Sequence, residues 1–175
     1  MKRIQLVGLM VVLGSMSLLL AEGVGIPKRE DVPKYLKMLQ TSQVAAERAK
    51  AAEMLGKRGG INANDVEVAV EPLKKTLQKD IDAKVRAAAA RALGDIRPED
   101  TAGTVKILID RLKNDSAMDV KMASVVALGQ FGGDAREALP DLRELGKKFD
   151  AKKSKEGQTI MTTIQIISMG KKKKN

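Results

Sequence analysis

Several acidic residues have the types and the spacing that general acid–base catalysis requires. They are Asp80 with Asp82, Glu67 with Glu71, and Asp95 with Glu99 and Asp100. Two neighbouring carboxylates can act as a general acid and a general base. Aspartate before a helix also accepts hydrogen bonds from the unpaired N–H groups of the first turn. We therefore interpret these acids as helix caps and solvated turn residues, and the sequence predicts no catalytic site.

A second chemical possibility is a metal site at Asn62, Asn64 and Asp65. This run resembles half of a calcium-binding loop, but it lacks the terminal bidentate Glu, because Glu67 follows Asp65 by only two residues. The chain contains no His and no Cys, which removes the commonest metal ligand, the usual general base and any thiolate nucleophile. We expect an ordinary turn here, and neither a metal nor a cofactor.

The elements that must position these acids are predicted to be helices of two alternating kinds. Helices of the first kind carry many lysines and leucines four residues apart, such as Leu73 with Leu77. They are predicted over 32–40, 70–79, 105–114 and 139–149. Helices of the second kind are rich in small residues and are predicted over 44–57, 83–96, 120–131 and, more weakly, 158–168. Pro72 and Pro140 are expected in first turns, where a missing N–H costs little. Loops are expected at 59–62, 97–100 and 132–134.

The segment 80–95 has a pattern that two other segments repeat. Its most visible mark is a Leu-Gly pair, found at Leu55-Gly56, Leu93-Gly94 and Leu128-Gly129. The glycines lie 38 and then 35 residues apart, a period in the range of stacked helical hairpins. In this register Arg86 aligns with Arg48. A single hairpin of this kind cannot bury its apolar stripe, so the units are expected to stack around one continuous core.

With these residues laid out, the sequence resembles HEAT repeats, specifically the short variety of phycobilisome-lyase-like proteins. The matching residues are Pro72-Leu73, Leu77, Asp80, Val85-Arg86, Ala88, Ala89, Ala92 and Leu93-Gly94, and then Leu108, Leu112, Asp115, Val120-Lys121, Ala123, Ala127 and Leu128-Gly129. Tetratricopeptide repeats have a similar period, but their aromatic positions are absent here. The resemblance implies an all-α solenoid of about four antiparallel HEAT-like hairpins over residues 27–168, in which the first and last units are the least regular.

The resemblance also implies an inter-repeat polar ladder. Its members in this chain are Asp80 with Arg86 and Asp115 with Lys121. We interpret them as structural, because Asp can accept N–H groups at a helix start and Arg can reach the acid of a neighbouring repeat. Lysine at position 121 weakens any two-pronged pairing there.

One face of the second helices is predicted to point away from the core. At 100° per residue, this stripe includes Lys84, Arg91, Met122, Val126 and Met161. Exposed Met and Val side by side indicate a docking patch for a partner. The alternative is an error of one residue in the register, or burial of the patch by the fourth hairpin.

The formal charge of +10 is concentrated at the two ends of the chain. Without Lys2, Arg3 and the run Lys171 to Lys174, the remainder carries about +4, which is ordinary for its size. With two Phe, one Tyr and no Trp, the chain also lacks stacking platforms for single-stranded nucleic acid. The sequence therefore predicts no specific nucleic-acid partner.

The first 25 residues have the pattern of an export signal. Lys2 and Arg3 precede an apolar core over 4–20, and Ala21-Glu22-Gly23 fits a small-x-small cleavage site. We expect a signal peptide over 1–23 and an exported protein, periplasmic or extracellular. The alternative is an uncleaved membrane anchor, since the core is at the lower limit of a spanning helix. Residues 169–175 are expected to form a disordered basic tail.

These observations favour a non-catalytic scaffold that binds another protein on the exposed stripe. The alternative from a different class is an envelope-associated protein whose Lys171 to Lys174 tail contacts an anionic polymer or lipid surface weakly. A third, a lyase-type enzyme or cofactor chaperone like some relatives, would need substrate-handling residues that the sequence does not show. HEAT-based metal hydroxylases use His-Glu ligand pairs, which a chain without His cannot supply.

Overall fold

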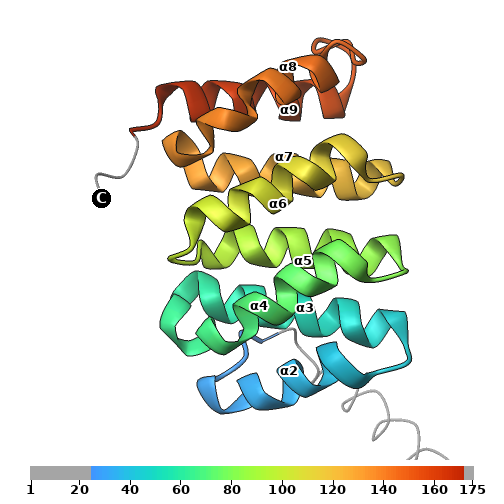
Figure 1. The fold of residues 1–175 in the computed structure, drawn as a ribbon, viewed down its shortest axis with the longest axis vertical. Helices are drawn as coiled ribbons and strands as arrows, with labels where there is room; N and C mark the ends of the chain where they lie inside the picture. The colour runs from blue at the N-terminus through green and yellow to red at the C-terminus, as the bar shows by residue number, and fades with distance from the viewer. Residues whose placement is uncertain (1–24, 172–175) are drawn as a thin grey trace, which may run out of the picture.

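The computed structural model describes residues 25–171, and this part of the chain is all-α, without strands. Helices follow one another as antiparallel hairpins, α2–α3, α4–α5, α6–α7 and α8–α9, stacked along the long axis of the molecule (Figure 1). The α-helices are α2 (Val32–Thr41), α3 (Ala45–Ile61), α4 (Glu67–Lys79), α5 (Ala83–Ile96), α6 (Thr101–Asn114), α7 (Met118–Phe131), α8 (Leu139–Gly146) and α9 (Lys155–Met169). Three 3₁₀ helices join them, η1 (Arg29–Asp31), η2 (Ala63–Val66) and η3 (Gly132–Ala138). The predicted stack of hairpins is confirmed.

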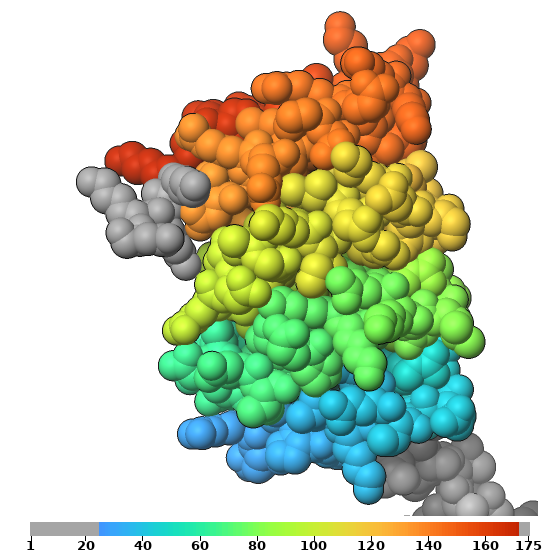
Figure 2. Space-filling model, viewed as in Figure 1, coloured from blue at the N-terminus to red at the C-terminus, as the bar shows by residue number. Residues whose placement is uncertain are grey.

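The stack has two layers of helices around a single core. The second helices α3, α5, α7 and α9 form one row and make most of the contacts between hairpins. The first helices form the other row, and each hairpin covers the next without a break (Figure 2). Between the rows, Leu73, Leu77, Leu93 and Leu128 are fully buried. Burying a leucine stabilises the fold by about 1.5–3 kcal/mol, so the stack depends on these shared side chains.

Close approach between second helices depends on the glycine of two of the three Leu-Gly pairs, Gly56 and Gly94. A Cβ added at Gly56 would lie 2.7 Å from the Cα of Ala92, and one added at Gly94 would lie 2.8 Å from the Cα of Ala127. These distances are too short for any side chain, so the backbones pack directly on each other. The repeat that was visible in the sequence is therefore a packing repeat.

Several predicted helix boundaries were wrong. Helix α6, for example, begins at Thr101 and not at residue 105. Helix α3 runs through the expected loop at 59–62 as far as Ile61. Gly59 lies inside this helix, at a site where a Cβ would collide with Ile96 and lie 2.7 Å from Cγ2 of Val66. The glycine therefore permits close packing here and does not break the helix. Helix α4 begins at Glu67, so Pro72 lies inside it and not in its first turn. The proline leaves one carbonyl, that of the exposed Val68, without its helical donor, and water can take that bond.

The last hairpin is complete but differs from its predicted bounds. Helix α8 ends at Gly146, and α9 begins at Lys155, where the hydroxyl of Ser154 accepts a hydrogen bond from the N–H of Gly157 at 2.9 Å. Arg136 of η3 donates to the carbonyl of Gly170 at 3.0 Å, which fixes the end of α9. Helix α9 therefore continues one residue beyond the predicted domain end at 168.

Among residues 25–171, no helix has both the length and the apolar character needed to cross a bilayer. The predicted signal segment and most of the predicted lysine tail lie outside these described residues.

Candidate functional site

Each hairpin turn begins with a polar residue whose side chain binds the backbone two residues later. The acceptors Ser42, Asp80, Asp115 and Asp150 receive the N–H groups of Val44, Asp82, Ala117 and Lys152 at 3.1, 2.9, 2.9 and 2.9 Å. This local bond closes the turn with the same geometry in every hairpin.

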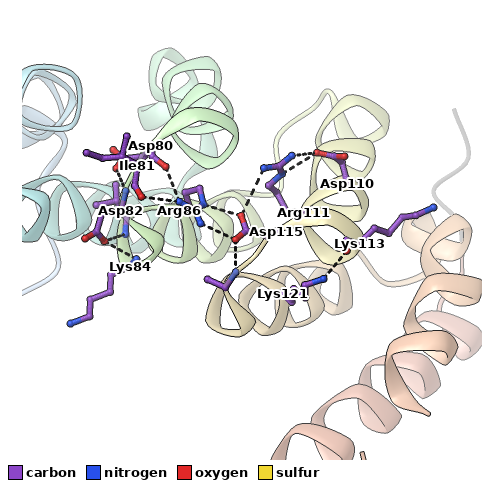
Figure 3. Close-up of polar contacts among 12 residues, drawn as sticks. Asp80, Ile81, Asp82, Lys84, Arg86, Asp110, Arg111, Lys113, Asp115 and Lys121 are labelled. Atoms are coloured by element: carbon purple, nitrogen blue, oxygen red, sulfur yellow. Dashed lines mark hydrogen bonds and ion pairs between the residues drawn. The ribbon is translucent and has the colours of Figure 1, made fainter. Parts of the chain in front are cut away.

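Two of these acids receive an arginine from the preceding hairpin. Arg48 donates from Nε and Nη2 to the two carboxylate oxygens of Asp80, at 2.7 and 2.8 Å. Arg86 does the same to Asp115, at 2.8 Å for both bonds, and its Nη1 donates to the main-chain carbonyl of Asp80 at 2.9 Å (Figure 3). The pairs therefore tie the first hairpin to the second and the second to the third. Arg48 was not among the predicted ladder residues, although its alignment with Arg86 was a signal for it.

The ladder shifts the pKa of its acids downward. Burial alone would raise the pKa of Asp115, but the hydrogen bonds from Arg86 and from the N–H of Ala117 outweigh burial, so the pKa lies below its ordinary value. Asp80 behaves in the same way: burial opposes the shift, and the bonds from Arg48 and from the N–H of Asp82 lower the pKa. Both acids are therefore ionised and held by arginine, which leaves neither as a proton donor near neutral pH.

The ladder ends at Lys121. Its ammonium donates to the main-chain carbonyl of Lys113 at 2.6 Å (Figure 3) and makes no ion pair in the described part of the chain. Asp150, which occupies the turn position of the last hairpin, is exposed and has Lys153 as its ion-pair partner at 3.9 Å. The predicted member Lys121 thus contacts a helix C-terminus in its own hairpin and not the acid of the next one.

The acids considered as catalytic pairs in the sequence make hydrogen bonds with other groups. Asp82 accepts the N–H groups of Lys84 and Val85 at 2.8 and 3.2 Å and caps α5. Asp95 accepts a hydrogen bond from Gln130 at 3.0 Å. Asp82 thus serves a helix end and Asp95 a neighbouring repeat, while Glu71 and Asp100 both accept hydrogen bonds from one ammonium group, that of Lys74.

In the possible calcium loop, the aspartate pairs with two arginines. Asp65 pairs with Arg58 and with Arg29, whose Nε lies 3.5 Å from it. The side chain of Asn62 accepts the N–H of Asn64 at 3.2 Å and caps η2. Within residues 25–171, no group of three or more acidic, His or Cys side chains has a metal-binding arrangement.

A buried lysine was missed by the sequence analysis. Lys74 of α4 is 5% exposed and donates to Glu71 at 2.8 Å and to Asp100 at 2.7 Å. Burial would lower the pKa of Lys74, but the two carboxylates outweigh it and raise the pKa. Asp100 also caps α6 by accepting the N–H of Gly103 at 3.0 Å. The sequence pattern did not mark Lys74, because its counterparts in the neighbouring repeats, Leu36 and Ile109, are apolar.

The structure exposes most of the predicted stripe on the second helices. Lys84 and Arg91 of α5 are exposed, and they line a groove of about 620 Å³ that also touches α3 and α7. Met122 is half-buried and packs against the core, while Val126 is 42% exposed and Met161 is 59% exposed. The five residues therefore occupy one face of the helix row, although Met122 contributes only part of its surface.

A second groove lies further along the same row, between α7 and α9. Its volume is about 510 Å³, and Val126 and Ile166 are its exposed apolar residues. Thr159, Thr162 and Thr163 add small polar groups to its lining. The face thus changes along the stack, from charged side chains over α3 and α5 to apolar and hydroxyl side chains over α7 and α9.

Comparison with known proteins agrees with this geometry. Residues 70–153 match the family described as HEAT repeats. A search of curated proteins gave no match. Sixteen chains of solved structures match, among them the crystal structure of an engineered protein from the Northeast Structural Genomics Consortium, which is 26% identical over 77% of this chain, with a TM-score of 0.59. The match spans 62% of that engineered chain. Residues 70–153 are therefore similar to HEAT repeats, and the described part of the chain is packed as a HEAT-like repeat array.

Proposed function

We propose that this chain is a non-catalytic scaffold that binds a segment of another protein along the stripe of its second helices. HEAT repeats generally serve protein interaction. The observation that supports this surface most directly is the exposure of Arg91, Val126 and Met161 on helices whose opposite faces are fully packed. A face with charged groups at one end and apolar groups at the other suits an amphipathic segment.

The proposal includes export to the periplasm or beyond. It is supported by the composition of residues 1–25, with two basic residues, an apolar run and small residues at its end. The phycobilisome-lyase-like subtype also stays a prediction, supported by the Asp80 to Gly94 pattern. The N-terminal sequence of the mature protein in cells would test export directly.

Capture of partners from the native envelope fraction tests the stripe. The bait carries a photoreactive side chain at position 161, and its variants are Arg91→Glu, Val126→Glu and Lys106→Glu. Lys106 is exposed on the first-helix row and serves as a matched charge-reversal control. We expect one crosslinked protein with the parent and the control, and its loss with Arg91→Glu or Val126→Glu.

A further arm of the experiment separates the stripe from the tail. Replacing Lys171 to Lys174 by serine should leave the crosslink unchanged. Raised salt should also leave it unchanged, whereas binding driven by the four lysines would weaken strongly with salt. Loss of the crosslink with the tail variant, or equal loss with Lys106→Glu, would contradict the proposal.

A further inference from the structure

The turns inside the hairpins all lie along one edge of the stack. Figure 1 shows the α2–α3, α4–α5, α6–α7 and α8–α9 connections on the same side, opposite the connections between hairpins. We name this side the turn edge, formed by residues 42–44, 80–82, 115–118 and 147–155. None of the five stripe residues belongs to this edge, although Lys155, at its end, also lines the groove between α7 and α9.

Three of the four turns on this edge hold an apolar side chain out in solvent. Val44 is 53% exposed, Ile81 is 92% exposed and Met118 is 42% exposed. Stacked helices lie about 8–10 Å apart, so the three side chains form a row along the edge. Exposing a side chain such as Ile81 so fully forgoes the stabilisation that its burial would provide.

The exposure of Ile81 is built into a firmly held turn. The carboxylate of Asp80 accepts the N–H of Asp82 at 2.9 Å, and Arg86 donates to the carbonyls of both Asp80 and Ile81, at 2.9 and 3.2 Å (Figure 3). Arg86 is itself held by Asp115 of the next hairpin. The backbone of the turn is therefore fixed by the ladder, and the ladder presents the isoleucine outward.

Exposed lysines lie at or next to three of the four turns on this edge, and most of them are in the last hairpin. In the last hairpin, five of the nine residues over 147–155 are lysine. The exposed lysines at or next to the turns are Lys75, Lys79, Lys113, Lys147, Lys148, Lys152, Lys153 and Lys155. Lys147 pairs with Glu144 at 2.7 Å, whereas Lys79, Lys148 and Lys152 make no ion pair in the described part of the chain. Their charge is available to an external anion.

The opposite edge provides an internal comparison. Ile61 and Val68 are also exposed there, at 56% and 67%. Their surroundings are acidic, because Glu67 and Glu71 are exposed in the same segment. That edge also carries Arg97, which is exposed and makes no ion pair among the described residues. What distinguishes the turn edge is therefore its larger number of exposed lysines beside its apolar side chains.

From this combination we infer that the turn edge is a peripheral docking surface for a bilayer of anionic phospholipids. A row of apolar side chains can enter the boundary between headgroups and acyl chains, while lysines bind the anionic headgroups. An anionic polymer would use the lysines but would gain nothing from Ile81. This inference does not depend on the proposed protein partner, because none of the five stripe residues belongs to the turn edge.

Single-cysteine labelling tests the inference on the full chain. The protein has no Cys, so Ile81→Cys and Ile61→Cys each carry one polarity-sensitive fluorophore. The probes are phosphatidylglycerol/phosphatidylcholine vesicles and pure phosphatidylcholine vesicles. We expect a blue shift of the label at 81 with the anionic vesicles alone, and no shift of the label at 61. Lys152→Gln with Lys153→Gln should weaken binding roughly 30-fold, at about fivefold per lysine near the surface.

Two further variants exclude other routes to the membrane. Replacing Lys171 to Lys174 by serine should preserve the blue shift at 81. Ile81→Ser should weaken vesicle binding of the unlabelled chain, and Val68→Ser should not. Equal shifts at 61 and 81, binding to neutral vesicles, or binding to anionic vesicles that Ile81→Ser leaves unchanged would each overturn the inference. The last result would mean that the edge binds through charge alone and does not distinguish a bilayer from another polyanion.

Discussion

The guanidinium of Arg86 and the carboxylate of Asp115 form two parallel hydrogen bonds, both 2.8 Å long, between consecutive hairpins. The two side chains are only 12% and 2% exposed. Arg86 also binds the main chain of its own turn through Asp80. One side chain thus joins the turn of its own hairpin to the turn of the next, and this arrangement recurs with Arg48 and Asp80.

Removal of Arg86 should destabilise the array strongly. The substitution Arg86→Ala leaves the buried carboxylate of Asp115 with only Arg111, 3.8 Å away, and the N–H of Ala117 as partners. Removing one partner of a buried ion pair costs up to about 3–5 kcal/mol. We expect faster hydrogen exchange in α5, α6 and α7, because repeat arrays open locally. Arg91→Ala, on the exposed face of the same helix, is the control and should change exchange little. Similar exchange in both variants would show that the pair contributes nothing to stacking.

Stability should fall in acid because of the ladder. The folded-state pKa of Asp115 is lowered, so its contribution is fully present above the unfolded value of about 3.9 and is lost as pH falls through the folded pKa. Asp115→Asn should be less stable by about 1.5–3 kcal/mol at pH 7, and urea unfolding should show this gap closing below about pH 4. The pKa of Glu144 is also lowered, by Lys147, but both side chains are exposed. The difference in unfolding free energy between the parent and Glu144→Gln should therefore disappear when salt is added. A gap for Asp115→Asn that is constant with pH would contradict this account.

Lys121→Arg should extend the ladder into the last hairpin. Asp150 already holds its turn as Asp115 does, with an N–H bond of 2.9 Å in each case. An arginine at 121 can supply the two-pronged bond that a lysine cannot. Because Asp150 is exposed, we expect a gain of up to about 1 kcal/mol in the stability of α9, measured by hydrogen exchange. The same substitution beside Asp150→Ala should give no gain, and an equal gain there would refute the pairing.

Two glycines of the repeat should respond in opposite ways to alanine. At Gly94 a Cβ would lie 2.8 Å from the backbone of Ala127, and separating the helices should cost about 1–3 kcal/mol. At Gly129 the nearest atoms, those of Thr163, are 3.4 Å away. There alanine fits and should stabilise the helix by up to about 1 kcal/mol. Thermal unfolding of the two variants measures both effects, and a loss of similar size at both sites would contradict this packing.

The sequence by itself determined the class of fold and the register of its repeats. The Leu-Gly pairs and the leucines four residues apart depend only on helical periodicity, which is a local property. For that reason α5 has the predicted bounds, Ala83–Ile96, and the order of hairpins is as predicted. The same local pattern placed the stripe residues Lys84 and Arg91 on the exposed face of α5.

Only the tertiary structure decided which groups meet across hairpins. Arg48 binds Asp80, 32 residues away, and Lys74 binds Asp100, 26 residues away, because stacking brings these elements together. Helical periodicity is a local property and does not predict such contacts. It also decided that Gly59 lies inside a helix, at a site where Ile96 and Val66 occupy the space of its missing side chain. Local propensity favours a break at two glycines, but the close packing of α3 against α5 outweighs that preference.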